Sequence, residues 1–213
     1  THIQANEVIQ LNEPVNIFDE QMFDSVKEEQ GVYKAKTKAA KADTIAHATK
    51  KAITEKMDED PAFYQKFSKL IQQAIEDFRA KRLSDLDYLN RVIDIRNKVV
   101  KRQHDDIPRK LGNSSDAIAY YGILKPFFKT HQLEDSICED ISADTAISIQ
   151  DILKKHWKVH FWDDEDAQKR TINEIDDFLY DEVKGKRGVE LSLDQMDEII
   201  ERTMQVAKHR NAI

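Results

Sequence analysis

The chain has 213 residues, of which 34% are charged, and its formal net charge at pH 7 is −7. This charge argues against a protein that coats nucleic acid without specificity, because such coating depends on clustered Lys and Arg. The single cysteine, Cys138, cannot form an internal disulfide, and no apolar run reaches the roughly 18 residues of a membrane span. We therefore expect a cytoplasmic protein with no membrane contact.

Glycine and proline are scarce, with five and four residues, and apolar residues recur mostly at intervals of three and four. This composition and spacing predict an all-α fold. We expect about seven or eight helices packed as antiparallel hairpins, with an extended N-terminal lead-in.

Residues 1–18 lack a helical pattern, and Pro14 cannot lie inside a helix, so this segment is predicted to be an extended linker. Residues 19–213 form the predicted helical domain. A possible subdivision lies near residues 104–115, where Pro108, Gly112 and two serines interrupt the helical period. Because the chain starts at Thr1 rather than Met, we expect it to be a piece of a larger protein, with residues 1–18 leading in from an upstream domain.

The first helix is expected to run from Asp19, its cap, to Glu29, and the next from Tyr33 to Met57. This second helix is the one clearly basic element, with seven lysines against Asp43 and Glu55. Such a face could contact DNA phosphates or could simply be solvated, and no aromatic residues interleave the lysines as in a base-stacking surface. The candidate DNA contacts are Lys34, Lys36, Lys38, Lys41, Lys50 and Lys51.

Two further helix starts are marked by Asp60, followed by Pro61, and by Ser84. Asp and Ser cap free N–H groups, and Pro presets the backbone at the first helical position. The second of these helices is expected to bury Leu86 and to end near Lys101. Together the two helices predict an αα-hairpin.

The next helix is expected to begin within Asn113–Asp116 and to be ended or kinked by Pro126. An acidic stretch follows, and a helix capped by Ser142 or Asp144 is expected to reach His156. The last helix is predicted from a capping box over residues 192–195, in which the first and last side chains cap each other's backbone.

His156 and His160 are four residues apart and could hold Zn²⁺ from one helix face. No third ligand lies nearby in sequence, so packing against Trp157 and Trp162 is the favoured interpretation. The acidic stretch before residue 144 does not have the spacing of a calcium loop and lacks its central glycine. Trp157 and Trp162 are the candidate anchors for a partner protein.

Four residues have the composition of a nuclease metal-and-lysine set: Asp176, Asp177, Glu182 and Lys184. That chemistry needs the Glu-x-Lys pair on a strand, where both side chains point to one face, whereas this segment has a helical period. Gly185 is expected to end the helix. We predict no catalytic, cofactor-binding or metal-binding residue in the chain.

Six segments carry a family resemblance, in this order: Asn16–Phe23, Lys41–His47, Glu55–Tyr64, Ile175–Glu182, Leu191–Ile200 and Val206–Arg210. Together they resemble the C-terminal region of the restriction (R) subunits of type I restriction-modification enzymes. The resemblance extends from about Val15 to Arg210 and is weakest over residues 105–151.

The resemblance implies a parent subunit with a nuclease domain and an ATP-dependent DNA motor, so ATP and Mg²⁺ would belong to its upstream domains. It also implies methyltransferase (M) and specificity (S) subunits as partners, and double-stranded DNA through the whole complex. By resemblance, this chain would support the motor and dock it to the methyltransferase core during restriction of foreign DNA. The alternative is an auxiliary helical module that contacts DNA through its basic helix face.

Overall fold

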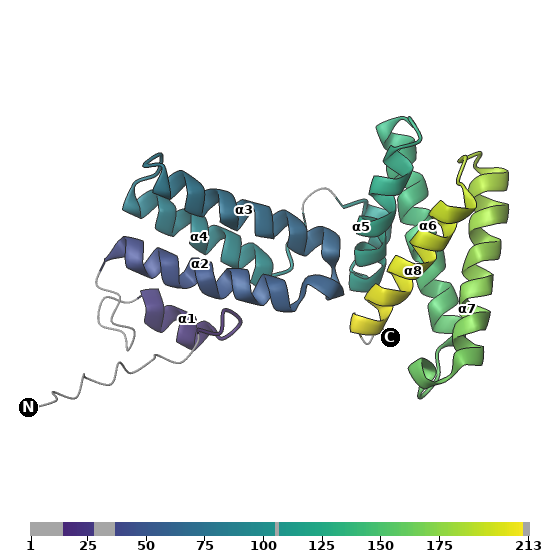
Figure 1. Cartoon of the computed structure of the whole chain (residues 1–213), viewed down its shortest axis with the longest axis horizontal. Helices are drawn as coiled ribbons and strands as arrows, with labels where there is room; N and C mark the ends of the chain where they lie inside the picture. The colour runs from purple at the N-terminus through teal and green to yellow at the C-terminus, as the bar shows by residue number, and fades with distance from the viewer. Residues whose placement is uncertain (1–14, 28–36, 105–106, 211–213) are drawn as a thin grey trace, which may run out of the picture. The chain divides into compact units, whose positions relative to one another are not determined.

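The computed structural model describes residues 15–27, 37–104 and 107–210. Within these ranges the chain forms eight α-helices and no β-strand, which confirms the all-α prediction (Figure 1). The chain divides into two compact units. Unit 1 comprises residues 1–53 and 67–103, and unit 2 comprises residues 54–66 and 104–213. Among the described helices, none combines the length and apolar composition needed to cross a membrane.

Unit 1 contains α1 (Glu20–Lys27), most of α2 (Lys38–Glu55), most of α3 (Pro61–Arg79) and α4 (Asp85–Val100) (Figure 1). The predicted cap of α1 is confirmed, since Asp19 Oδ1 accepts the N–H of Met22 at 3.0 Å. Ser84 caps α4 in the same way, with Oγ accepting the N–H of Asp87 at 3.2 Å. The predicted start of the second helix at residue 33 lies outside the described residues.

The inward face of α4 differs from the predicted one. Leu86, expected in the core, is 47% exposed, whereas Tyr88 is fully buried. The Tyr88 ring stacks on Phe78 of α3 at a centroid distance of 4.3 Å, and its hydroxyl donates to Asp43 of α2 at 3.0 Å. A tyrosine ring buries more area than a leucine and also needs a partner for its hydroxyl, so the Tyr88 face turns inward.

Arg96 of α4 is fully buried, although the sequence pattern alone gives no reason to place a charged residue inside. Its Nε donates to the backbone carbonyl of Ile17 at 2.7 Å, and its Nη1 donates to Glu20 at 2.9 Å. The guanidinium also lies 3.7 Å from the ring centroid of Phe23. Since Ile17 and Phe23 are buried as well, Arg96 fastens residues 17–23 to α4.

Unit 2 contains α5 (Ser115–Lys129), α6 (Asp135–His156), α7 (Glu165–Phe178) and α8 (Leu193–Arg210) (Figure 1). Its short segments are η1 (Met57–Glu59), η2 (Arg109–Leu111), η3 (Phe161–Asp163) and the π-helical η4 (Leu179–Lys186). α5 packs against both α6 and α8, and α8 also contacts η1. The core of the unit forms where these helices meet, and it includes the buried side chains Tyr120, Phe128 and Ile149.

Two predicted boundaries in unit 2 are wrong. α5 continues through Pro126 to its end at Lys129, so the proline does not end the helix. Pro126 lacks the N–H that would bond to the carbonyl four residues earlier, and the helix continues with that one backbone hydrogen bond missing. α6 begins at Asp135 rather than at Ser142 or Asp144. The acidic stretch therefore forms the first turns of α6, and its initial carboxylates lie at the end of the helix that favours negative charge.

Two other predicted caps are confirmed. Asp60 Oδ1 accepts the N–H of Phe63 at 3.1 Å at the start of α3. At the start of α8, the Ser192 N–H donates to Gln195 Oε1 at 3.0 Å, and the Gln195 N–H donates to Ser192 Oγ at 3.2 Å. This reciprocal pair is the predicted capping box.

Candidate functional site

The candidate DNA-contacting lysines that the structure describes do not share one environment. Lys34 and Lys36 lie outside the described residues. Lys41 is 7% exposed, so we leave it out of any DNA-contacting face. Lys38, Lys50 and Lys51 are exposed, and Lys50 donates to Gln72 of α3 at 3.0 Å.

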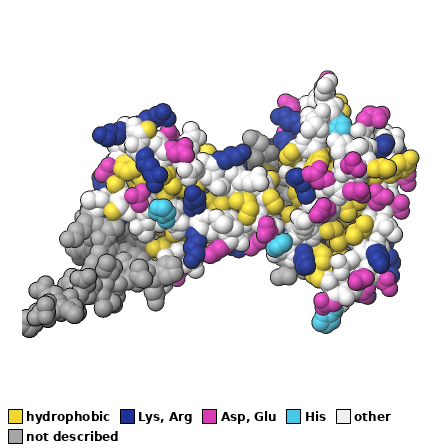
Figure 2. Space-filling model, in the orientation of Figure 1, with side chains coloured by type: hydrophobic (Ala, Val, Ile, Leu, Met, Phe, Trp, Pro, Cys, Tyr) yellow, Lys and Arg dark blue, Asp and Glu magenta, His cyan; other side chains and the backbone are white. Residues whose placement is uncertain are grey.

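Charge is distributed unequally between the two units. Unit 1 has 16 Lys and Arg against 13 Asp and Glu, a net charge of +3, whereas unit 2 has 17 against 27, a net charge of −10. Part of the positive charge of unit 1 lies at the α3–α4 turn, where Arg79, Lys81 and Arg82 are exposed (Figure 2). Asp77 accepts hydrogen bonds from Arg82 at 3.2 Å and from Arg91 at 3.0 Å. The run of basic residues at 79–82 is visible in the sequence but is not among the predicted DNA contacts.

Trp157 and Trp162, the candidate partner anchors, lie in the connection between α6 and α7. Phe161 is buried between them, with ring centroids 5.2 Å from Trp157 and 4.9 Å from Trp162. Both tryptophans are half-buried, and the indole Nε1 of Trp162 is buried without a hydrogen-bond partner among the described residues. Val159, in the same connection, is 82% exposed. The tryptophans thus pack the loop, and their role as anchors stays a prediction.

His156 and His160 do not share a helix face. His156 ends α6, and its Nε2 lies 2.6 Å from Glu174 Oε2 of α7. His160 lies beyond the helix end in a left-handed conformation, with φ of 61°. Among the described residues, no group of three His, Cys, Asp or Glu side chains is placed to hold a metal ion.

Glu174 also accepts hydrogen bonds from Lys155 Nζ, at 2.7 and 2.8 Å. These bonds, together with the one from His156, hold the pKa of Glu174 below its usual range. A carboxyl with a depressed folded-state pKa stabilises the fold above its unfolded pKa, and this contribution is lost as the pH falls through the folded value.

Replacing Lys155 by alanine is therefore expected to raise the pKa of Glu174 toward its ordinary value and to reduce stability slightly near neutral pH. Carboxyl carbon chemical shifts followed through a pH titration would measure the pKa. Lys154→Ala removes a neighbouring exposed lysine that is not among the groups hydrogen-bonded to Glu174, so it should leave that pKa unchanged. The same Glu174 pKa in Lys155→Ala and in the wild type would contradict the conclusion that Lys155 lowers it.

α7 does not end at Gly185 as predicted, but passes directly into the π-helix η4. The Arg187 N–H donates to the carbonyl of Glu182, five residues earlier, at 2.9 Å. The chain turns away at Gly188, whose φ of +68° is easily reached only by glycine. The residues of the nuclease-like set lie on this helical backbone, as expected. The π-helix itself is not predicted from the sequence, and such segments are rare and often occur at functional sites.

Two cations and two carboxylates form an ion cluster where η4 ends beside α6. Lys110 of η2 donates to Asp140 and, at 2.7 Å, to Asp144. Arg187 donates to the same two carboxylates, at 3.2 Å to Asp140. Lys110 and then Arg187 lower the pKa of Asp140, as expected for a carboxylate that accepts charge-assisted hydrogen bonds.

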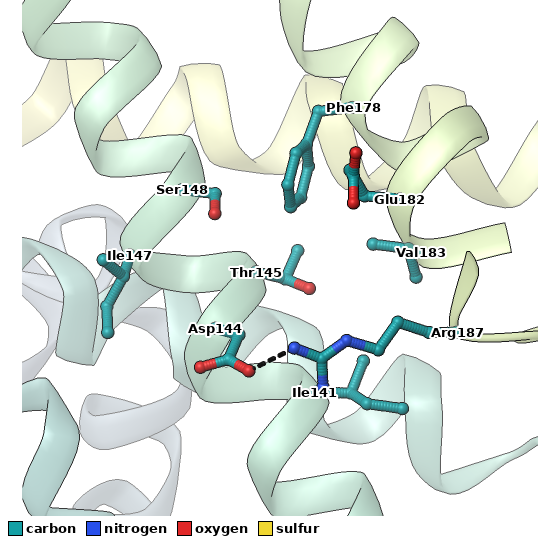
Figure 3. Close-up of a pocket in the computed structure, with 9 residues that line it drawn as sticks. All are labelled: Ile141, Asp144, Thr145, Ile147, Ser148, Phe178, Glu182, Val183 and Arg187. Atoms are coloured by element: carbon teal, nitrogen blue, oxygen red, sulfur yellow. Dashed lines mark hydrogen bonds and ion pairs between the residues drawn. The ribbon is translucent and has the colours of Figure 1, made fainter. Parts of the chain in front are cut away.

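A cavity of about 310 Å³ lies next to this cluster, between α6 and the α7–η4 segment (Figure 3). It is lined by nine residues: Ile141, Asp144, Thr145, Ile147, Ser148, Phe178, Glu182, Val183 and Arg187. Its walls combine apolar side chains with hydroxyl and carboxylate oxygens. Of these residues, the sequence points only to Asp144, as a possible helix cap, and to Glu182, because the lining joins two segments that lie thirty or more positions apart.

A family model described as "Type I restriction enzyme HindI endonuclease subunit-like, C-terminal" matches residues 3–167. This range includes the middle of the chain, where the resemblance seen in the sequence is weakest, and ends within α7. The cavity residues Phe178, Glu182, Val183 and Arg187 lie beyond it. Neither the curated proteins nor the solved structures provide a match to this chain.

Proposed function

The chain belongs to this family, as the C-terminal region of a type I restriction enzyme endonuclease subunit, and from this premise we propose that it docks the subunit's ATP-dependent DNA motor to the methyltransferase and specificity subunits. The observation that carries the proposal is the family match over residues 3–167, more than three quarters of the chain. In this proposal, nuclease and ATPase chemistry, with ATP and Mg²⁺, belongs to other domains of the parent subunit.

The charge of unit 2 supports a docking role. A net charge of −10 on a helical unit favours association with a basic protein surface and disfavours contact with DNA phosphates. Exposed apolar residues, among them Val159 and Leu193, could supply the desolvated contacts that a stable interface also needs.

Assembly of the parent enzyme tests the proposal. A parent subunit that ends before Asn16 is expected to lose association with the tagged methyltransferase and specificity subunits, as measured by co-purification. The isolated 213-residue chain, added in excess, should compete with the intact subunit for the same complex. A truncated subunit that still associates and translocates DNA normally would rule out this role.

A second candidate function is a DNA contact by unit 1, favoured by its net charge of +3 and its exposed lysines. Replacing Lys38, Lys50 and Lys51 by glutamate is expected to weaken binding to a short DNA duplex. If each lysine neutralises one phosphate, the slope of log K against log salt should fall by about 0.9 for every phosphate that is no longer neutralised. Fluorescence anisotropy at several salt concentrations would measure both the affinity and this slope.

Unit 2 offers a matched control, because Lys169→Glu, Lys184→Glu and Lys186→Glu change the net charge by the same amount. This triple variant should keep the salt dependence of the wild type. Equal losses of affinity in the two triple variants would indicate a response to net charge alone. That result, or absence of duplex binding at low salt, would eliminate a DNA contact through α2.

A further inference from the structure

The cavity beside η4 presents oxygen atoms that have no hydrogen-bond donor. Thr145 is 1% exposed, its side chain points into the cavity in Figure 3, and its hydroxyl makes no hydrogen bond among the described residues. Ser148, one helical turn later on α6, is equally without a side-chain partner within the described ranges. Both hydroxyls line the cavity and are able to accept a hydrogen bond, so an occupant that donates one would be favoured.

Glu182 adds a carboxylate oxygen to this set. Its Oε1 accepts from Lys186 at 2.5 Å, while no hydrogen bond to its other oxygen occurs among the residues described. Lys186 is 71% exposed, and an exposed pair of this kind contributes little, so a better-placed cation can compete with it.

The one cation in the lining is already neutralised. Arg187 donates to Asp140 and Asp144, and Lys110 donates to the same two carboxylates. Two positive and two negative charges therefore cancel, and the charge left in the cavity is that of Glu182 with its exposed partner Lys186. The cavity atoms still able to form hydrogen bonds are mainly acceptors. They therefore favour a ligand with many hydrogen-bond donors and few acceptors.

The aromatic and aliphatic side chains of the cavity lining favour some of these ligands over others. The ring of Phe178 forms one wall of the cavity, and Ile141 and Val183 are buried beneath the polar atoms. A guanidinium is planar, carries five N–H donors and no acceptor, is weakly hydrated, and stacks on aromatic rings. An ammonium is more strongly hydrated and presents no flat face, so it fits this lining less well.

We propose that this cavity binds an arginine side chain presented by a basic segment of a partner protein. Charge and size both favour this occupant. Unit 2 has a net charge of −10, which attracts a basic segment, and about 310 Å³ has room for one long side chain but not for a folded element. The inference rests on the proposed docking role and names the chemistry of the partner.

The test is an NMR titration of the 213-residue chain, with labelled methyl groups, by N-acetyl-L-arginine N-methylamide. The methyl signals of Thr145 and Val183 should shift and saturate, with a dissociation constant in the range of about 1–10 mM. The matched lysine amide should bind at least about fivefold more weakly, and the uncharged citrulline amide should not bind. Absence of saturable shifts, or an equal response to citrulline, would overturn the inference.

Two substitutions test whether the arginine amide binds in this cavity. Glu182→Gln, which removes the carboxylate charge, and Thr145→Val, which keeps the side-chain shape but removes the hydroxyl, should each weaken arginine amide binding by about fivefold or more. Glu190→Gln is the matched control, because Glu190 is exposed and does not line the cavity, and it should bind as wild type. Wild-type affinity in Glu182→Gln would refute the assignment of this cavity.

The same variants separate this inference from the docking role as a whole. If the arginine amide binds normally but the isolated 213-residue chain fails to compete with the parent subunit for the methyltransferase complex, the docking proposal fails and the cavity remains an arginine site. If assembly is normal but the titration gives no saturable shift, the cavity assignment alone is overturned.

Discussion

Replacing Arg96 by alanine is expected to lower the free energy of unfolding of unit 1 by about 3–4 kcal/mol. The carbonyl of Ile17 would lose its 2.7 Å donor inside the protein, which costs about 1–3 kcal/mol. Loss of the guanidinium over the Phe23 ring and the space left by the side chain add to that cost. The Glu20 ion pair contributes less, because the Glu20 side chain is 62% exposed.

Urea denaturation would give the change in stability, and hydrogen exchange of the α4 amides would show that it arises in unit 1. Arg91→Ala is the matched control, since Arg91 lies on the same helix but its side chain is 34% exposed, and its loss should cost less than about 1 kcal/mol. Arg96→Lys should recover only part of the loss, because an ammonium lacks the planar fork that reaches several acceptors. Similar stabilities for Arg96→Ala and Arg91→Ala would show that Arg96 does not fasten residues 17–23.

Arg96 also shows where sequence-based prediction stops. The helix starts capped by Asp19, Ser84 and Ser192 follow from residues within three positions of each cap, so the sequence predicts them correctly. Burial of Arg96 depends on Ile17 and on other residues more than seventy positions away, which no local pattern encodes.

The prediction of which face of α4 is buried is wrong for a related reason. The apolar stripe of that helix can be drawn through Leu86 or through Tyr88, which point to opposite sides of the helix. Tyr88 faces inward because Phe78 and the Asp43 carboxylate are there to contact it, and both belong to other helices. Periodicity thus predicts that a helix is amphipathic more reliably than which of two similar faces is buried.

The cavity could not be predicted from the sequence at all. Residues 172–183 have an ordinary helical period, which carries no signal for the change to π-helical hydrogen bonding at Leu179. That change determines where Glu182 and Arg187 lie relative to α6. The sequence offers Glu182 only as a nuclease-like residue, which helical geometry rules out, whereas in the structure it lines the same cavity as Thr145 and Ser148.

Replacing Phe128 by alanine is expected to lower the free energy of unfolding of unit 2 by about 3–5 kcal/mol. Phe128 is fully buried on α5, in the core cluster that α5 builds with α6 and α8. Removing its ring forfeits the transfer free energy of the buried area and leaves a cavity that close-packed neighbours can fill only in part. Since α6 and α8 pack against α5, the loss of stability should reach the surfaces that we propose dock to the partner subunits.

Phe127→Ala is the matched control, because Phe127 is the same residue type one position earlier on α5 but is only half-buried, with Arg202 lying 5.3 Å from its ring centroid. It should cost clearly less than Phe128→Ala, about 1–2 kcal/mol. Urea denaturation compares the two variants, and hydrogen exchange in α5 and α6 tests whether the destabilisation is confined to unit 2. A smaller loss of stability in Phe128→Ala than in Phe127→Ala would mean that the core of unit 2 is not centred on Phe128. If unit 2 does dock the motor, co-purification with the methyltransferase should fall in the same order as stability, because only the folded unit presents the docking surface.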